Sequence, residues 1–261
     1  MKYCITSLIF NNYEPVREPI EYDKNCDYFL FTDSKDLKSD IWKVIYLKDF
    51  DTDKLTGIQK MLKFKYIFYK YIPNFKDYDY FIQIDHSIVL KKSLRPIIEY
   101  IDKHNFDMSI GIHPCRNNFI EEYKAWHNYR NLDQKYIDMF FENTKDYDYN
   151  LLGLMETTIK IYKNNNTIIS FIDDMFKMLN ISDFNDKNDQ CYFTYLLYKY
   201  FDKLKINFHP AALYRQSDYM CILKHGSLEN VELENPINKP GDIIKLFNTL
   251  IRINNLDEYS K

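Results

Sequence analysis

The sequence is poor in glycine, and the placement of its five glycines excludes two common ways of binding phosphate. None of them forms the pattern G-x-G-x-x-G or G-x-x-x-x-G-K, in which a glycine-rich loop wraps around phosphate groups. A nucleotide that binds to this protein is therefore held by other means. The glycines stand at positions 57, 111, 153, 226 and 241.

Cysteine pairs and long apolar runs are also missing. The five cysteines are odd in number and scattered, with no C-x-x-C pair, which argues against a disulfide framework and a structural zinc site. No apolar run reaches the roughly 18 residues of a membrane-spanning helix. Residues 1–10 read as a strand and lack the basic region and cleavage site of a signal peptide. We therefore expect a cytoplasmic protein without a transmembrane segment.

Neither sign of charge dominates the chain. Thirty-five basic and 38 acidic side chains give a formal net charge of −3, so bulk electrostatics give no reason to expect a nucleic-acid partner. With 46% hydrophobic and 28% charged residues, the composition is that of an ordinary soluble globular protein. The 261 residues can share one core, and the sequence shows no repeat or Ser/Gly linker, so we expect a single domain.

Short apolar runs alternate with helical segments in the first third of the chain, which is typical of a sheet built from βα units. Strands are expected at residues 2–10, 27–32, 42–47, 80–84, 108–112, 157–162 and 206–208. Helices are expected at 58–72, 94–103, 119–143 with a break near 131, 167–179, 189–201 and 241–253, and a loop at 11–25. This pattern predicts an α/β fold.

Asp85 follows residues 80–84, which form an almost wholly apolar strand. Ligands of open α/β sheets bind beyond the carboxyl ends of the strands, so a carboxylate here is suited to hold a divalent cation that binds a diphosphate. Ser87 follows at a spacing that puts both side chains on the same side of an extended segment. The alternative is that Asp85 only caps the turn before Ser87 or the next helix.

A stripe of lysines is a candidate phosphate site. Lys60, Lys63 and Lys70 fall on one face of the predicted helix 58–72, and the first two lie near the binding edge of the sheet. Their charge is suited to neutralise phosphate. The alternative is that they are solvated lysines of an amphipathic helix.

The loop at residues 113–122 is rich in groups that bind hydroxylated ligands, among them His113, Arg116 and Glu121. Loops that a rigid scaffold positions carry function disproportionately, so these residues are candidates for binding an acceptor. The alternative is that Arg116 pairs with Glu121 or Glu122 at the start of the next helix.

Two later acids are candidates for the chemistry. Asp189, beside Gln190, is placed to take a proton from an acceptor hydroxyl, and Glu156 to stabilise positive charge at a sugar carbon. The alternative for Asp189 is that it only caps the following helix. Near the C-terminus, His225 is either a surface residue or a neutral imidazole that completes a metal shell.

Taken together and in this order, these segments resemble a poorly characterised family of predicted glycosyltransferases, a domain of unknown function found in bacteria and in plant Golgi proteins. The resemblance covers most of residues 1–225. The matching stretches are residues 3–13, 28–33, 60–73, 80–90, 113–122, 153–162 and 189–195, together with His225.

The resemblance implies a GT-A-type fold, which is a single Rossmann-like domain with a mixed, mostly parallel central sheet flanked by helices. Residues 1–112 would then bind the nucleotide sugar and 113–240 the acceptor, and 241–261 would contain a C-terminal helix. The implied activity moves a sugar from a nucleoside diphosphate sugar, most simply a UDP-sugar, to a hydroxyl group of a glycan, protein or lipid.

The resemblance also implies a set of ligand contacts. A manganese or magnesium ion would be held by Asp85 and His225, and Ser87 stands where the D-x-D motif has its second acid. Arg116 would orient the acceptor together with its neighbours His113 and Glu121, and with Gln190. The base and ribose would rest near Thr6, Tyr13 and Asp33, and the phosphates near Lys60 and Lys63.

The stereochemical outcome stays open at this level. An inverting enzyme would use Asp189 or Glu156 to deprotonate the incoming hydroxyl, whereas a retaining one requires no strong protein base. Two other functions compete with transfer. One is a catalytically inactive sugar-binding or scaffolding module, favoured by the serine at position 87. The other is a metal-dependent hydrolase, disfavoured because none of the six histidines forms an H-x-x-H or H-x-D pattern.

Overall fold

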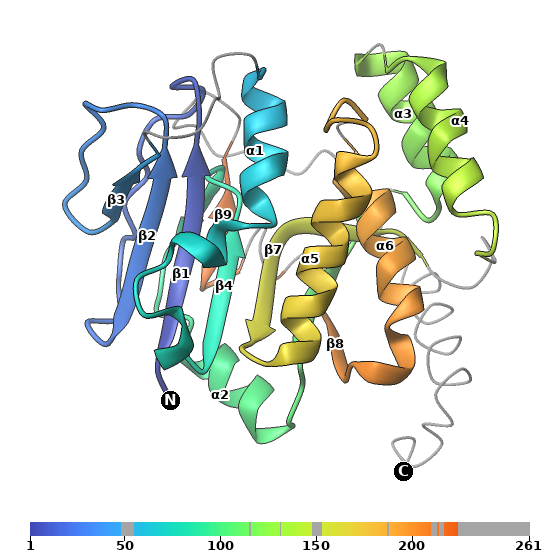
Figure 1. Cartoon of the computed structure of the whole chain (residues 1–261). Coiled ribbons are helices and arrows are strands. Elements are labelled where there is room, and N and C mark those ends of the chain that lie inside the picture. The colour runs from blue at the N-terminus through green and yellow to red at the C-terminus, as the bar shows by residue number, and fades with distance from the viewer. Residues whose placement is uncertain are drawn as a thin grey trace.

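A seven-stranded sheet runs through the computed structural model, with strand order β3-β2-β1-β4-β7-β6-β8 (Figure 1). The structure describes residues 1–47, 55–114, 116–130, 132–147, 153–186, 188–209, 213 and 217–223. The strands of this sheet are β1 (Tyr3–Ile9), β2 (Cys26–Thr32), β3 (Lys43–Tyr46), β4 (Tyr80–Ile84), β6 (Met108–Ile112), β7 (Met155–Lys163) and β8 (Ile206–His209).

The sheet is mixed but mostly parallel. Strand β1 pairs in parallel with β2 and with β4, and β2 pairs in parallel with β3. Strand β8 is parallel to β6. Strand β7 is antiparallel to both of its neighbours, β4 and β6. The predicted α/β class with one such sheet flanked by helices is therefore confirmed. The sheet includes strands from both sides of residue 112, so the two predicted halves share one main sheet.

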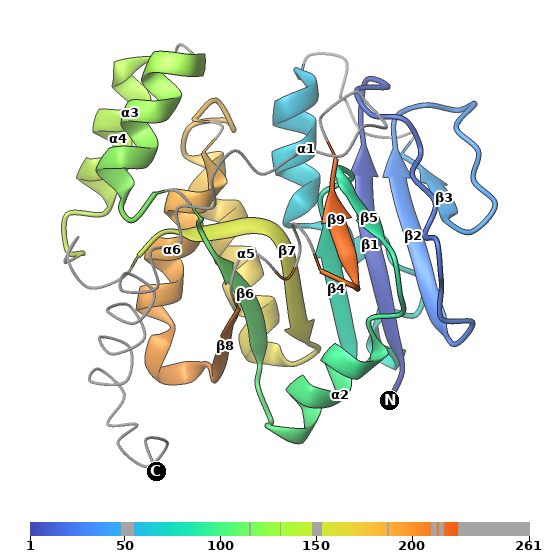
Figure 2. The ribbon, with the colours of Figure 1, turned by 180° about the vertical axis from the view of Figure 1, so that it is seen from behind.

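Helices cover both faces of the sheet. They are α1 (Gly57–Lys65), α2 (Arg95–Lys103), α3 (Phe119–Arg130), α4 (Gln134–Asn143), α5 (Asn166–Asn180) and α6 (Asp189–Lys199), with short 3-10 helices η1 (Phe68–Tyr71), η2 (Phe75–Asp77) and η3 (Phe201–Lys203). Helices α1, α5 and α6 lie on one face, and α2 lies on the other (Figures 1 and 2). The expected C-terminal helix, 241–253, lies outside the described residues. None of the helices in the described part is long and apolar enough to cross a bilayer.

The alternation of side chains along each strand builds two apolar cores. In β4, Phe81 joins the core under α1, α5 and α6, whereas Tyr80 and Ile82 join the core under α2. All three side chains are buried, as expected for a central strand with both faces covered.

Helix α1 is shorter than predicted, and the prediction of one helix from 58 to 72 is wrong. The α-helix ends at Lys65, Tyr66 is its C-cap, and η1 follows. All five residues from 64 to 68 are buried, which a single face of an α-helix cannot achieve. The change from an α-helix to a 3-10 helix allows the consecutive side chains of residues 64–68 to be buried together.

The pairing of β7 with β6 contains an irregularity. Lys160 pairs with Ile110, but the next residue of β6, Gly111, pairs with Glu156. The residues of β7 between these two positions are therefore extra relative to β6, an irregularity of the kind that bends a strand. This bend shapes the start of β7, which lies at the edge where the parallel strands end.

A small second sheet, not predicted from the sequence, lies on the α2 face. It pairs β5 (Ile88–Leu90) with β9 (Met220–Ile222) in antiparallel fashion (Figure 2). The N–H group of Ile20 in the loop 11–25 donates to the carbonyl of Leu90 at 2.8 Å. The expected loop is therefore tied to the end of this small sheet.

Buried His86 also anchors the loop 11–25. Its Nε2 accepts from the backbone N–H of Arg17 at 3.0 Å, so the neutral ring carries its proton on Nδ1, which lies 3.0 Å from Ser7 Oγ. The Arg17 guanidinium donates to the carbonyl of His86 and pairs with Glu14. Burial, reinforced by the charge of Arg17, lowers the pKa of His86 to about 4.

Candidate functional site

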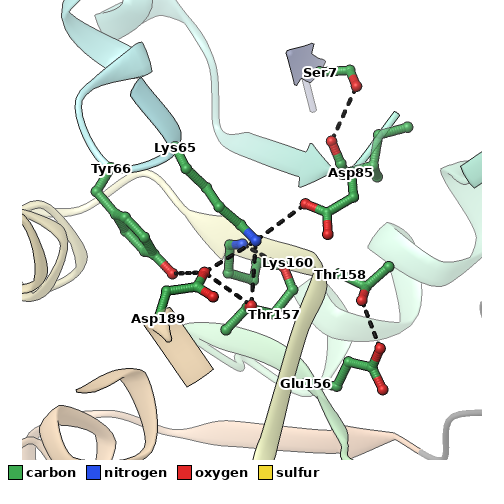
Figure 3. Close-up of polar contacts among 10 residues, drawn as sticks. Ser7, Lys65, Tyr66, Asp85, Glu156, Thr157, Thr158, Lys160 and Asp189 are labelled. Atoms are coloured by element: carbon green, nitrogen blue, oxygen red, sulfur yellow. Dashed lines mark hydrogen bonds and ion pairs between the residues drawn. The ribbon is translucent and has the colours of Figure 1, made fainter. Parts of the chain in front are cut away.

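Polar side chains from four elements meet at the edge of the sheet where the parallel strands end. Asp85 directly follows β4, Thr157 lies near the start of β7, Asp189 is the first residue of α6, and Lys65 is the last residue of α1 (Figure 3). Since β7 runs antiparallel to its neighbours, its first residues lie beside the last residues of β4. In an α/β sheet this edge is where ligands bind.

Lys65 is the centre of this arrangement. Its Nζ lies 3.1 Å from Oδ1 of Asp85 and 3.0 Å from Oδ2 of Asp189, and it donates to the hydroxyl of Thr157 at 3.2 Å (Figure 3). The side chain of Lys65 is only 3% exposed. One buried ammonium group therefore joins two carboxylates that are far apart in the sequence.

Three further contacts complete the group. The hydroxyls of Tyr66 and Thr157 donate to Oδ2 of Asp189 at 2.7 and 3.0 Å, and Lys160 donates to the carbonyl of Thr157 at 2.6 Å. We call these residues the Lys65 cluster: Lys65, Tyr66, Asp85, Thr157, Lys160 and Asp189.

The cluster fixes the charge of its members. Burial alone would lower the pKa of Lys65, but the charges of Asp189 and Asp85 raise it above its usual value. Burial alone would raise the pKa of Asp189, but Lys65 and Lys160 lower it. For Lys160, burial and the neighbouring charge of Lys65 together lower the pKa well below its usual value. The cluster therefore holds a stable ammonium group at Lys65 and a stable carboxylate at Asp189.

Asp85 is the member of the cluster that a ligand can reach most easily. Its side chain is 32% exposed, whereas that of Asp189 is 11% exposed. Residues 85–88 form a turn, in which the N–H of Ile88 donates to the carbonyl of Asp85 at 3.0 Å. The segment is therefore not extended, and the spacing argument that placed Asp85 and Ser87 on the same side does not hold.

The predicted metal ligands are only partly described. Asp85 is ion-paired with Lys65, Ser87 is buried, and His225 lies outside the described residues. Within the described ranges, no three His, Cys, Asp or Glu side chains come together in a way that could hold a metal ion. The side chains that the structure describes therefore do not fit a preformed site for manganese or magnesium, which are held by several oxygen ligands.

The residues predicted to bind the nucleotide are partly engaged with one another. Lys60 pairs with Asp33 at 2.7 Å and donates to Asn11, so its charge is already neutralised. Thr6 is fully buried and donates to the carbonyl of Ile82 inside the sheet. Tyr13 is 65% exposed on the loop after β1. The predicted contacts with base and ribose remain predictions.

Lys63 and Lys70 do not extend this site. Lys63 is half-buried on α1, whereas Lys70 lies on η1 and pairs with Asp173 in an exposed ion pair. The predicted stripe of three lysines is therefore divided between two elements. Lys65, which lies outside the stripe, is the lysine of this segment that reaches the two carboxylates.

The candidate acceptor loop is held by an ion pair between a half-buried arginine and a buried glutamate. Arg116 contacts Glu122, whose carboxylate is fully buried, and Glu122 also accepts from the indole N–H of Trp126 at 2.8 Å. Arg116 is itself 33% exposed and lies beside buried His113. This is the pairing that the alternative reading of the loop predicted. A role of Arg116 in acceptor binding stays a prediction.

Glu121 and Gln190 occupy the first turns of their helices. Glu121 accepts from the backbone N–H of Asn117 at 2.8 Å and is exposed, which makes it a local contact at the start of α3. Gln190 is half-buried in the first turn of α6, beside Asp189. Of these two, Gln190 lies next to the Lys65 cluster.

Glu156 faces away from the Lys65 cluster. It accepts from the hydroxyl of Thr158 at 2.7 Å, whereas Thr157 between them bonds to Asp189, as expected for side chains that alternate along a strand (Figure 3). Glu156 and His209 pair with the two sides of Gly111 in β6. Burial lowers the pKa of His209 to about 4.

The capping alternative for Asp189 is wrong. Asn188 is the N-cap of α6 and accepts from the backbone N–H of Cys191, which leaves the Asp189 carboxylate for Lys65. Lys65, Tyr66, Thr157 and Lys160 are not among the site residues predicted from the sequence. A lysine inside the largely apolar run 64–68 and another inside the predicted strand 157–162 are signals that could have identified the two buried lysines.

Comparison with known proteins finds remote structural likenesses. Mouse xyloside xylosyltransferase 1, in its apo form, is 12% identical over 82% of this chain and 87% of that chain, with a TM-score of 0.43. The mannosyltransferase Ktr4p from S. cerevisiae is 14% identical over 80% of this chain and 68% of that chain, with a TM-score of 0.42. No protein-family model matches the sequence, and no curated protein is significantly similar to it.

Proposed function

We propose that this protein is a glycosyltransferase that moves a sugar from a nucleoside diphosphate sugar, most simply a UDP-sugar, to a hydroxyl group. The observation that carries the proposal is the joining of Asp85 and Asp189 by the buried ammonium of Lys65 at the edge of the sheet where ligands bind. The resemblance of the sequence to predicted glycosyltransferases points to the same activity.

The cluster has the charges that sugar transfer needs. The bond between the anomeric carbon and the phosphate oxygen breaks, and its electron pair goes to the departing nucleoside diphosphate. Fixed positive charge close to the departing oxygens stabilises this build-up of negative charge. Lys65 is the group suited to this role, because its two counterions keep it protonated and in one place.

Asp189 is suited to balance charge rather than to accept a proton. Lys65 and Lys160 keep its pKa low despite burial, so it is a weak base near neutral pH. A stable carboxylate at this position would stabilise the positive charge that develops at the anomeric carbon as the donor bond breaks.

Transfer with retention of configuration fits such a site, because that outcome requires no strong protein base. The new bond forms between the acceptor oxygen and the anomeric carbon, and the hydroxyl proton passes to the departing diphosphate. NMR of the first product formed would give the anomeric configuration. An inverted product would show that a group other than a weakly basic Asp189 takes the proton.

Turnover of a panel of nucleotide sugars, with and without hydroxyl acceptors, tests the proposed activity. We expect an acceptor to accelerate release of the nucleoside diphosphate. A metal-dependent hydrolase would release product at a rate independent of the acceptor. An inactive module would bind the nucleotide, and raise the melting temperature, without releasing product.

Asp85→Ala is the matching site variant. Because Asp85 is the more exposed of the two carboxylates of the Lys65 cluster, its loss should reduce turnover by about 100-fold or more. Asp173→Ala is the control, since it removes a carboxylate of an exposed ion pair on α5. Far-UV circular dichroism of both variants would show that the fold is kept. Retained activity in Asp85→Ala would contradict the assigned site.

A further inference from the structure

Lys65 stands between the two carboxylates of the cluster, where a bridging cation would otherwise balance their charge. We propose that Lys65 supplies the fixed positive charge beside the donor diphosphate, and that this protein binds and uses its donor without a divalent cation. The inference rests on the proposed function and replaces the manganese or magnesium ion that the sequence resemblance implies.

The contacts of Asp189 give the first reason. One oxygen of this carboxylate, Oδ2, takes the ammonium of Lys65 and the hydroxyls of Tyr66 and Thr157. These three donors come from α1, its C-cap and β7 and are all buried. The carboxylate is thus held by groups of the protein that are built into its core, and its charge is already balanced by one of them.

The residues around Asp85 give the second reason. Ser87 replaces the second acid of a D-x-D motif with a neutral hydroxyl, and the turn at 85–88 removes the extended geometry that would align the two side chains. Ser87 is 3% exposed. In the ranges that the structure describes, Asp85 therefore lacks the further acidic partners from which a cation site is built.

Charge repulsion gives the third reason. The ammonium of Lys65 lies 3.1 Å from Asp85 and is kept protonated by both carboxylates. A divalent cation on the same carboxylate would have to bind next to this positive charge, and the two positive charges repel each other. The ammonium and a metal ion therefore compete for Asp85.

The affinity of the full-length protein for UDP, GDP and ADP, measured by titration calorimetry in EDTA and again in manganese chloride, tests the inference. We expect the dissociation constant of the preferred nucleotide to agree within about threefold between the two conditions. Turnover of the matching nucleotide sugar should likewise persist in EDTA. Binding that is more than about tenfold weaker in EDTA would overturn the inference and leave the proposed function standing. Binding in neither condition would overturn both.

Variants at position 65 separate a role of its charge from a role in folding. Lys65→Arg keeps the positive charge and should bind nucleotide in EDTA, whereas Lys65→Gln should bind at least about tenfold more weakly in EDTA and recover affinity when manganese is added. Lys70→Gln, on the exposed pair with Asp173, is the matched control and should behave as the unmodified protein. Should Lys65→Gln fail to fold, the nucleotide affinity of the unmodified protein in EDTA and in manganese still tests the inference.

Discussion

Lys65 and Lys160 are lysines whose side chains are almost completely buried, a rare position for a charge. Burial of an ammonium group is unfavourable unless other groups pair with it and hydrogen-bond to it. Lys65 meets this condition with two carboxylates and a hydroxyl. Lys160 contacts the carbonyl of Thr157 and the ring face of Tyr66, and burial and the charge of Lys65 lower its pKa well below the usual value. Removing a carboxylate partner of Lys65 would leave a buried charge with less compensation.

Tyr66→Phe is expected to show how much one neutral donor contributes to the Lys65 cluster. The change removes a buried hydrogen bond to Asp189 but leaves Lys65 and Thr157 in place, so we expect the free energy of unfolding to fall by about 1.5 kcal/mol. Urea denaturation would measure the loss.

Tyr69→Phe is the control for this variant. The hydroxyl of Tyr69 also donates to an aspartate, Asp173, but this contact is partly exposed to solvent. We expect its loss to cost about 0.5 kcal/mol, because water replaces the bond. Equal losses in the two variants would contradict the weight given to the buried bond.

At this scale the sequence predicts single residues better than their partners. Asp85 is recognisable because it ends an apolar strand at a predicted binding edge. Tyr66 and Asp189 are 123 residues apart, and their contact depends on how α1 and α6 pack on the same face of the sheet. No local pattern encodes that contact, and so the pairing of Lys65 with both acids was not predicted.

The start of α1 is fixed by a capping box, which is the element-scale feature that positions Lys65. The hydroxyl of Thr56 accepts from the N–H of Gln59, and the side chain of Gln59 accepts from the N–H of Thr56. Gln59 also donates to the carbonyl of Asp183 and to the side chain of Asn185, which ties α1 to the chain between α5 and α6.

Thr56→Ala removes one half of this capping box. We expect the free energy of unfolding to fall by about 1 kcal/mol, because the N–H of Gln59 loses its acceptor. Thermal and urea denaturation would measure the loss, and Thr56→Ser, which keeps a hydroxyl, should restore most of it. A variant Thr56→Ala as stable as the unmodified protein would show that the box contributes little.

The anchoring of the loop 11–25 by His86 predicts a dependence of stability on pH. Since the folded protein holds this pKa near 4, below the usual value near 6.5, the unfolded chain takes up a proton first as the pH falls. Stability contributed by neutral His86 is therefore present above pH 6.5 and is lost between about pH 6.5 and 4. The slope amounts to at most about 1.4 kcal/mol per pH unit.

His86→Gln should remove this part of the slope. The measurement is the difference in unfolding free energy between the variant and the unmodified protein, followed from pH 7 to pH 4.5 by urea denaturation. Burial lowers the pKa of His209 to about 4 and raises that of Asp186 to about 7, so both groups titrate in this range. They do so in both proteins, and their contributions cancel in the difference. A difference that does not change with pH would contradict the assignment.

Elements with a strong internal pattern were predicted well, and elements defined by distant partners were not. The strand at 80–84 and the helix at 167–179 were found within a residue of their observed ends, because burial on both faces and a helical stripe are visible in the sequence. Strands β5 and β9 are only three residues long, and each is a strand only through its pairing with the other.

On the scale of the whole molecule, the main sheet joins the two ends of the described chain. Strand β4 pairs with β7 across the predicted boundary at residue 112, and β6 pairs with both β7 and β8. A division at this boundary would separate β7 from the sheet on both of its sides. We therefore expect the two halves to unfold together.

The two tryptophans test this cooperativity. Trp42 is buried beside His86 in the first half, and Trp126 lies on α3 in the second. In Trp126→Phe and in Trp42→Phe, the urea midpoint from fluorescence of the remaining tryptophan should coincide with that from far-UV circular dichroism. Separate midpoints would show two independently folding units.

The reversal of β7 has a consequence for how the protein tolerates sequence change. In an all-parallel sheet, each strand leads into a connecting loop at the edge where ligands bind, and such loops tolerate amino-acid substitutions readily. Here the start of β7 lies at that edge: Met155 and Glu156 pair with β6, and the carbonyl of Thr158 accepts from the N–H of Asp85 at 2.8 Å. A mutational scan should therefore find residues 155–158 far less permissive than the loops beside them. Natural or engineered changes of specificity would then occur in the surrounding turns, while the sequence of the reversed strand stays constant.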